Sequence, residues 1–121
     1  MAVPPARTTE AEGTAVASYF LIESKGSWAG PGAGTFLRDA EALAGAGHRV
    51  RVYLVEDGVL SAAGAAPEIE RLAAAGVEVL VDDFSAAQRA LGGMLSPHVR
   101  FAGMDAVAAA LAEDECRGVW H

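Results

Sequence analysis

The sequence predicts a single α/β domain, a three-layer α/β/α arrangement around a mostly parallel five-stranded sheet. Segments rich in Val, Leu and Ile alternate with segments whose apolar residues recur at helical spacing. The strand segments are apolar almost throughout, as in parallel sheets that are covered on both faces. The length of 121 residues suits one domain, and a hydrophobic content of 52% with only 7% aromatic residues predicts a core of Ala, Val and Leu.

The first third of the chain predicts an arm, a strand, a loop and a helix. Residues 1–14 contain Pro, Thr, Glu, Gly and Ala without periodicity, so we expect a flexible arm before the domain at 15–121. The continuous apolar run at 16–24 predicts a central strand. Four glycines and a proline make 25–34 a loop. Apolar residues at helical spacing then predict a helix over about 35–46.

The middle of the chain predicts a second strand, a helix and a third strand. Residues 48–58 alternate and then become apolar, and they end in acidic residues and a glycine. Pro67 is suited to the first turn of a helix, and Gly76 to its end. The Val- and Leu-rich run at 77–81 predicts a buried strand that ends in two aspartates.

The last third of the chain completes the alternation. We expect a short helix over 85–91, where Ser85 and Gln88 have the form of a capping box. A strand at 98–102, a helix at 104–112 and a final strand at 118–120 follow. Five strands and four helices with short joints imply right-handed crossovers and helices on both faces of the sheet.

Composition argues against several classes of function. With nine Lys and Arg, a net charge of −7 and a pI near 4.8, the chain lacks the basic surface that nucleic acids need, so we expect no nucleic-acid partner. No apolar run reaches the length of a membrane span, and the N-terminus does not resemble a signal peptide. We therefore expect a cytoplasmic protein without membrane contact. A single cysteine, Cys116, excludes an intrachain disulfide and a CxxC motif.

Several segments in this order resemble the DsrE/DsrF/DsrH (TusBCD-like) family of small sulfur-relay proteins. They are Ala-Gly-His-Arg-Val-Arg-Val-Tyr-Leu at 46–54, Glu-Asp-Gly-Val at 56–59, Ala-Gly-Val-Glu-Val at 75–79 and Glu-Cys-Arg-Gly-Val-Trp at 115–120. The resemblance covers roughly Val16 to the end. It implies a DsrE-like (flavodoxin-like) topology and trimers, hexamers or hetero-oligomers with DsrE-like subunits. A sulfur-relay protein would be a further partner.

The resemblance also marks a departure at the end of the third strand. Members of the family that transfer sulfur have a cysteine there, whereas this chain has Asp82, followed by Asp83, Phe84 and Ser85. A carboxylate cannot hold a persulfide. The resemblance therefore implies a member without the catalytic cysteine, acting as a structural or partner subunit.

The two aspartates leave several roles open. Their oxygens could bind Mg²⁺ or Ca²⁺, or share a proton as an acid–base pair, and Asp82 to Ser85 together form a candidate ligand-binding tip. Neighbours along a strand point to opposite faces, so the two carboxylates need not converge. We favour a structural role, in which Asp83 caps the helix near Ser85 and Asp82 accepts hydrogen bonds from a loop.

The glycine-rich loop is a second candidate binding site. Its backbone N–H groups, at the start of the following helix, could wrap an anion. The candidate residues are Gly26, Ser27, Trp28, Gly30, Gly32, Gly34 and Thr35. The loop has neither a P-loop ending nor a GxGxxG spacing. We favour an interface loop in which exposed Trp28 is the anchor.

The remaining reactive side chains give weaker signals. Cys116 is the only thiol, but its acidic neighbours at 113–115 oppose a thiolate, and a structural role is favoured over a carrier role despite Arg117. His48, His98 and His121 are not at metal-ligand spacing. We expect no metal site and no cofactor.

Three functional hypotheses follow. The first is a non-catalytic DsrE-like protein that acts in oligomerisation or binds a partner or small ligand. The second is a sulfurtransferase or persulfide carrier that uses Cys116, or chemistry built on Asp82. The third is a nucleotide- or flavin-binding module that uses the glycine-rich loop.

Overall fold

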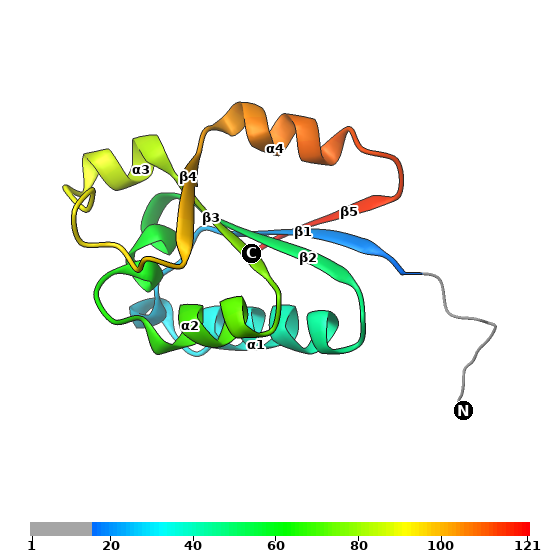
Figure 1. Cartoon of the computed structure of the whole chain (residues 1–121). Helices are drawn as coiled ribbons and strands as arrows, with labels where there is room; N and C mark the ends of the chain where they lie inside the picture. Colours follow the sequence, from blue (N-terminus) through cyan, green and yellow to red (C-terminus); the bar gives the residue numbers. More distant parts are fainter. Residues whose placement is uncertain (1–15) are drawn as a thin grey trace.

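A computed structural model describes residues 16–121 (Figure 1). The predicted arm at 1–14 lies outside these residues. Five strands alternate with α-helices and two 3₁₀ helices in the described part of the chain. The elements are β1 (Ser18–Glu23), η1 (Ser27–Ala29), α1 (Gly32–Gly45), β2 (Arg49–Leu54), η2 (Glu56–Ala62), α2 (Pro67–Ala74), β3 (Glu78–Asp82), α3 (Asp83–Gln88), β4 (Val99–Ala102), α4 (Met104–Leu111) and β5 (Cys116–Trp120).

The five strands form one sheet in the order β4-β3-β2-β1-β5, and all four pairings are parallel. The predicted parallel α/β sheet is therefore confirmed. The strand order differs from the 2-1-3-4-5 order of flavodoxin itself. The chain after β4 crosses the sheet through α4 and adds β5 beside β1, on the side away from β2.

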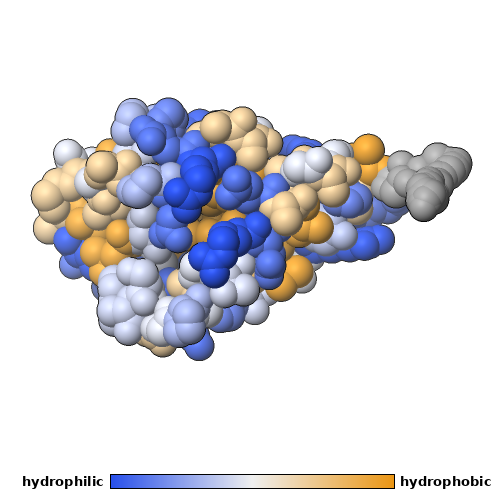
Figure 2. Space-filling model, turned by 90° about the horizontal axis from the view of Figure 1, so that it is seen from below, coloured by the Kyte–Doolittle hydropathy of each residue, from blue (hydrophilic) through white to orange (hydrophobic). Residues whose placement is uncertain are grey.

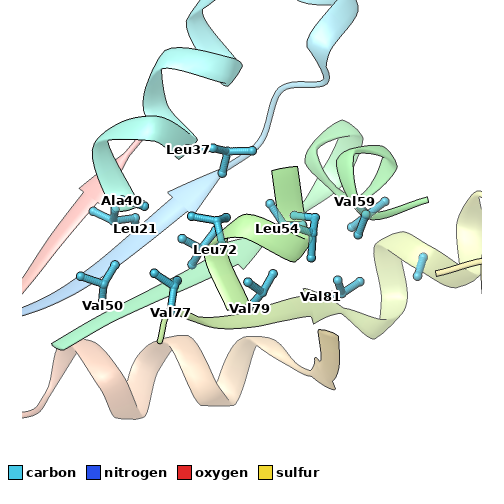
Figure 3. Packing of buried hydrophobic residues seen from close by; sticks show 14 of the residues in the cluster. Leu21, Leu37, Ala40, Val50, Leu54, Val59, Leu72, Val77, Val79 and Val81 are labelled. Atoms are coloured by element: carbon cyan, nitrogen blue, oxygen red, sulfur yellow. The ribbon is translucent and has the colours of Figure 1, made fainter. Parts of the chain in front are cut away.

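The larger core lies between the sheet and the pair α1 and α2, which cover one face (Figure 1). Alternate residues of β2 and β3 point into it, where they meet Leu37 and Ala40 of α1 and Leu72 of α2 (Figure 3). Burying each Val or Leu side chain in this core contributes about 1.5–3 kcal/mol. The strand residues in this layer are Leu21, Val50, Val52, Leu54, Val79 and Val81, and Val77 joins them from the position before β3.

The opposite face carries α4 and a smaller apolar cluster around Phe20, Tyr53 and Val107. Toward the amino-terminal ends of the strands this face becomes polar. Arg51 is buried there, with its guanidinium 5.2 Å from the centre of the Phe20 ring and in a two-pronged ion pair with Glu113. The hydrogen bond from Arg51 holds the pKa of the Glu113 carboxyl below its usual range.

Two predicted boundaries are wrong for physical reasons. The helix α1 begins at Gly32 and not near Thr35, directly after Pro31, whose fixed φ of −74° suits the start of a helix. The second strand ends at Leu54, and residues 56–62 form η2. Gly58 in η2 lies directly against the backbone carbonyl of Glu23, a space in which no side chain would fit.

The surface of the α1–α2 face is mixed in character. Figure 2 views the molecule from this side, and hydrophilic residues occupy its middle while hydrophobic ones lie in separate patches. None of the helices in residues 16–121 has the length and apolar character needed to cross a membrane.

Candidate functional site

Asp82 occupies the end of β3, as predicted, and is only 3% exposed. Its Oδ1 accepts a hydrogen bond from the Tyr53 hydroxyl at 2.7 Å. Its Oδ2 accepts two from Ser85, from the backbone N–H at 2.9 Å and from the hydroxyl at 2.6 Å. The hydroxyl of Ser85 in turn accepts the N–H of Glu56 at 2.8 Å. This Asp82 cluster therefore joins the segments that follow β2 and β3.

The Asp82 cluster also shifts the acidity of its members. Burial by itself raises the pKa of Asp82, but the hydrogen bonds from Ser85 and Tyr53 outweigh it, and the pKa is lowered overall. Burial, followed by the hydrogen bond to Asp82, raises the pKa of the Tyr53 hydroxyl far above its ordinary value. Both groups therefore keep one protonation state at neutral pH, the carboxylate and the phenol.

The residue that caps α3 differs from the predicted one. The N-cap of α3 is Asp82, which accepts the N–H of Ser85, whereas Asp83 is the first helical residue and is exposed. The expected cap at Asp83 and the expected helix start at Ser85 are therefore wrong. The reason is that the helix follows β3 directly, and the last strand residue is the one with extended backbone angles. The hydroxyl of Ser85 is buried and bonded to a carboxylate, so it is not placed to attack a substrate.

Three large apolar side chains lie exposed on the elements around the Asp82 cluster. Phe84 of α3 is 66% exposed, Phe101 of β4 52% and Met104 of α4 53%. The sulfur of Met104 is 3.7 Å from the Tyr53 hydroxyl, so Met104 lies beside the cluster. Phe101 pairs with Val81 and therefore points to the α1–α2 face of the edge strand. We call these three residues the β4 rim.

The glycine-rich loop is divided in the structure. Ser27 and Trp28 belong to η1, and the indole of Trp28 packs over Gly26 while remaining 62% exposed. Gly32, Gly34 and Thr35 belong to the first turn of α1. Gly32 and Thr35 line a hollow of about 320 Å³ to which the residues of the Asp82 cluster do not contribute. The two predicted ligand-binding groups therefore do not form one site.

His121 also lines that hollow, and it pairs with Glu23, a partner that the sequence pattern does not reveal. The carboxylate of Glu23 is fully buried at the end of β1, and its oxygens lie 2.9 and 3.0 Å from Nδ1 of His121. The backbone N–H of Lys25 donates to the same carboxylate at 2.9 Å. A glutamate at the end of an otherwise apolar strand was the available signal, but its partner lies 98 positions away in the sequence.

Cys116 is far from the Asp82 cluster along the strands. It begins β5 opposite Ser18, the first residue of β1, whereas Asp82 is the last residue of β3. The two lie at opposite ends of a parallel sheet. The half-buried thiol accepts an N–H from Arg51 at 3.8 Å. Within residues 16–121, no group of three or more His, Cys, Asp or Glu is arranged to hold a metal ion.

No protein-family model matches the chain, and no curated protein sequence matches it. Solved structures match its fold. The ychN protein of E. coli superposes with a TM-score of 0.71 at 19% identity, over 84% of this chain and 98% of that one. MTH1491 of Methanobacterium thermoautotrophicum, a protein of unknown function, superposes with a TM-score of 0.72 at 12% identity, over 88% of this chain and all of that one. The chain therefore has the fold of these two proteins, a single DsrE-like α/β domain with an all-parallel five-stranded sheet.

Proposed function

We propose that the protein is a DsrE-like subunit that works by assembling with copies of itself, and not by transferring sulfur from the end of the third strand. The observation that carries the proposal is the state of Asp82. Both of its oxygens are occupied by hydrogen bonds from Tyr53 and Ser85, in a place closed to solvent. The end of β3 therefore links β2 to α3 through hydrogen bonds, and Asp82 offers no nucleophile there.

The β4 rim supplies the surface for assembly. Phe84, Phe101 and Met104 are each more than half exposed, and large exposed apolar side chains on neighbouring elements are typical of interfaces. β4 is also the last strand on its side of the sheet, so one of its edges has no strand partner. The resemblance to DsrE-like proteins favours a second copy of this chain as the occupant, and it alone connects the protein with sulfur metabolism.

The β4 rim can be tested by charge substitution. We expect Phe101→Glu and Met104→Glu to convert the oligomer to monomers, because each places a carboxylate in an apolar contact. Sedimentation velocity over a concentration series measures the change. Leu111→Glu is the matched control, since Leu111 lies at the far end of α4 and is 46% exposed.

Two outcomes would overturn the assembly proposal. One is a wild-type protein that remains monomeric at all concentrations. The other is an oligomer that dissociates in Leu111→Glu as readily as in Met104→Glu. Circular dichroism of each variant separates loss of assembly from loss of fold.

A persulfide carrier on Cys116 is the second candidate function. The observation in its favour is the Arg51 guanidinium, which lies 3.8 Å from the sulfur, because reactive cysteines lie in electropositive surroundings. After treatment of the protein with a persulfide donor, a carrier gains the mass of one sulfur atom, reversibly by reductant. We expect no such gain in wild type, because Arg51 already pairs with Glu113. A gain that is absent in Cys116→Ser would favour the carrier function instead.

A further inference from the structure

The side chain of His121 is held in one orientation by contacts on three sides. Its backbone N–H donates to Ile22 at 2.8 Å, and its carbonyl accepts the N–H and the hydroxyl of Ser24 at 3.0 and 2.8 Å. Its ring stacks on Phe36, with centroids 5.1 Å apart and an interplanar angle of 21°. With Nδ1 on the buried carboxylate of Glu23, the ring has little freedom to turn.

This orientation fixes the position of the imidazole proton. A carboxylate accepts, so the neutral ring keeps its proton on Nδ1, toward Glu23, and leaves the lone pair of Nε2 free. His48 has the opposite arrangement, because its Nδ1 accepts the N–H of Ala17 at 3.1 Å. The chain thus holds two histidines in opposite tautomers, and only His121 has a buried carboxylate behind it.

The hollow of about 320 Å³ lies on the open side of this ring. It is lined by Pro31, Gly32, Thr35, Phe36, Asp39 and His121. Nε2 faces the start of α1, where a methyl group on Gly32 would lie 3.1 Å from it. The Phe36 ring suits an apolar ligand body, and the carboxylate of Asp39 disfavours an anion. The volume is at the lower end of the range of ligand pockets.

We propose that Glu23 and His121 form a proton-transfer dyad for a small uncharged molecule that carries a hydroxyl or thiol group. Nε2 of His121 accepts the proton of that group as it is deprotonated, and the negative charge of Glu23 stabilises the imidazolium that results. His121 is the residue that touches the ligand. Glu23 is a positioning residue that sets the tautomer. This site is separate from the β4 rim and does not depend on assembly.

The tautomer is tested by imidazole ¹⁵N NMR of the full chain. We expect the neutral ring of His121 to carry its proton on Nδ1, and that of His48 on Nε2. In Glu23→Gln the amide cannot stabilise an imidazolium, and we expect the His121 resonances to change while those of His48 stay the same. A proton on Nε2 of His121 in the wild type would overturn the proposal.

Reactivity is tested with diethyl pyrocarbonate, followed by mass spectrometry of each histidine. The Nε2 lone pair attacks a carbonyl carbon of the reagent, an N–C bond forms, and the C–O bond to the leaving ethyl carbonate breaks. Glu23 accepts the Nδ1 proton and returns it to solvent, and ethyl carbonate takes up a proton from solvent and decomposes to ethanol and carbon dioxide. We expect half-buried His121 to react faster than exposed His98. In Glu23→Gln we expect His121 to react about tenfold more slowly than it does in the wild type. We expect benzyl alcohol, used as the probe ligand, to protect His121 saturably and His98 not at all.

A second variant, Gly32→Ala, tests the ligand site even if Glu23→Gln does not fold. It leaves Glu23 in place, and its methyl group, which would lie 3.1 Å from Nε2 of His121, crowds the ring and fills the hollow beside it. We expect it to weaken the protection by benzyl alcohol. Reaction of His121 at the rate of His98 would overturn the proposal, as would equal rates in wild type and Glu23→Gln or protection that Gly32→Ala does not change.

Discussion

At the scale of single residues, the carboxylate at the end of β3, that of Asp82, has a structural role. Parallel strands of α/β proteins deliver their functional groups at this position. Here the carboxylate of Asp82 instead holds the start of α3 through Ser85 and the end of β2 through Tyr53. Hydrogen bonds to a charged group contribute about 1.5–3 kcal/mol each, so the arrangement contributes to stability and leaves no oxygen for a ligand.

Asp82 should make stability depend on pH in acid. Its pKa is lower in the folded protein than in the unfolded chain, where an aspartate titrates near 3.9. The stability that it contributes is therefore complete above about pH 5, and it is lost as the pH falls through the folded-state pKa. We expect Asp82→Asn to lower the free energy of unfolding by about 2 kcal/mol at pH 7 and by much less at pH 3.

Urea unfolding at a series of pH values measures this difference. The exposed neighbour gives the control, since Asp83→Asn should change stability by no more than about 0.5 kcal/mol at pH 7. A gap between wild type and Asp82→Asn that stayed constant from pH 7 to pH 3 would contradict the lowered pKa.

The sequence predicts the positions of such residues better than their partners. The sequence predicts Asp82 at the end of a buried strand, because a Val- and Leu-rich run ending in carboxylates is a local pattern. Tyr53 lies 29 positions before it and on another strand, so their hydrogen bond depends on the register of β2 and β3. Glu23 and His121 were not connected for the same reason, since β1 and β5 bring them together only in the folded sheet.

At the scale of elements, η2 is the segment that the sequence described least well. Its residues follow an apolar strand and were predicted to extend it through Gly58. The chain turns into a 3₁₀ helix instead, because it must pass against the end of β1, where only a glycine fits. Helices with clear apolar periodicity, such as α2 and α4, were predicted to within a residue or two of their observed bounds.

The close packing of Gly58 gives a direct test. A methyl group there would collide with the backbone of Glu23, which cannot move without disturbing its hydrogen bond with the N–H of Val55. We expect Gly58→Ala to lower the free energy of unfolding by about 1–3 kcal/mol, measured by urea denaturation at pH 7. Gly45→Ala is the control, because the space beside Gly45 is open and alanine favours a helix. Equal stability of the two variants would contradict the packing.

At the scale of the whole molecule, the layers and the parallel sheet were predictable and the order of the strands was not. Apolar strands alternating with amphipathic helices determine a covered parallel sheet. They do not determine on which side of β1 the last strand is added. That choice depends on α4 crossing the sheet, and the residues that fix α4, such as Val107 and Ala110, contact side chains from several strands.

The position of β5 beside β1 has a consequence for how the molecule folds. Ser18 and Cys116 pair across 98 positions of sequence, so joining these strands closes a loop that includes every other element. The entropy of such a closure costs about 4 kcal/mol in the simplest chain model, and contacts of this range slow folding. Until β5 docks, β1 is an edge strand, and one of its sides exposes unpaired backbone groups. If β5 docks after the other strands, its docking slows folding and lengthens the interval in which the open edge of β1 can pair with another chain.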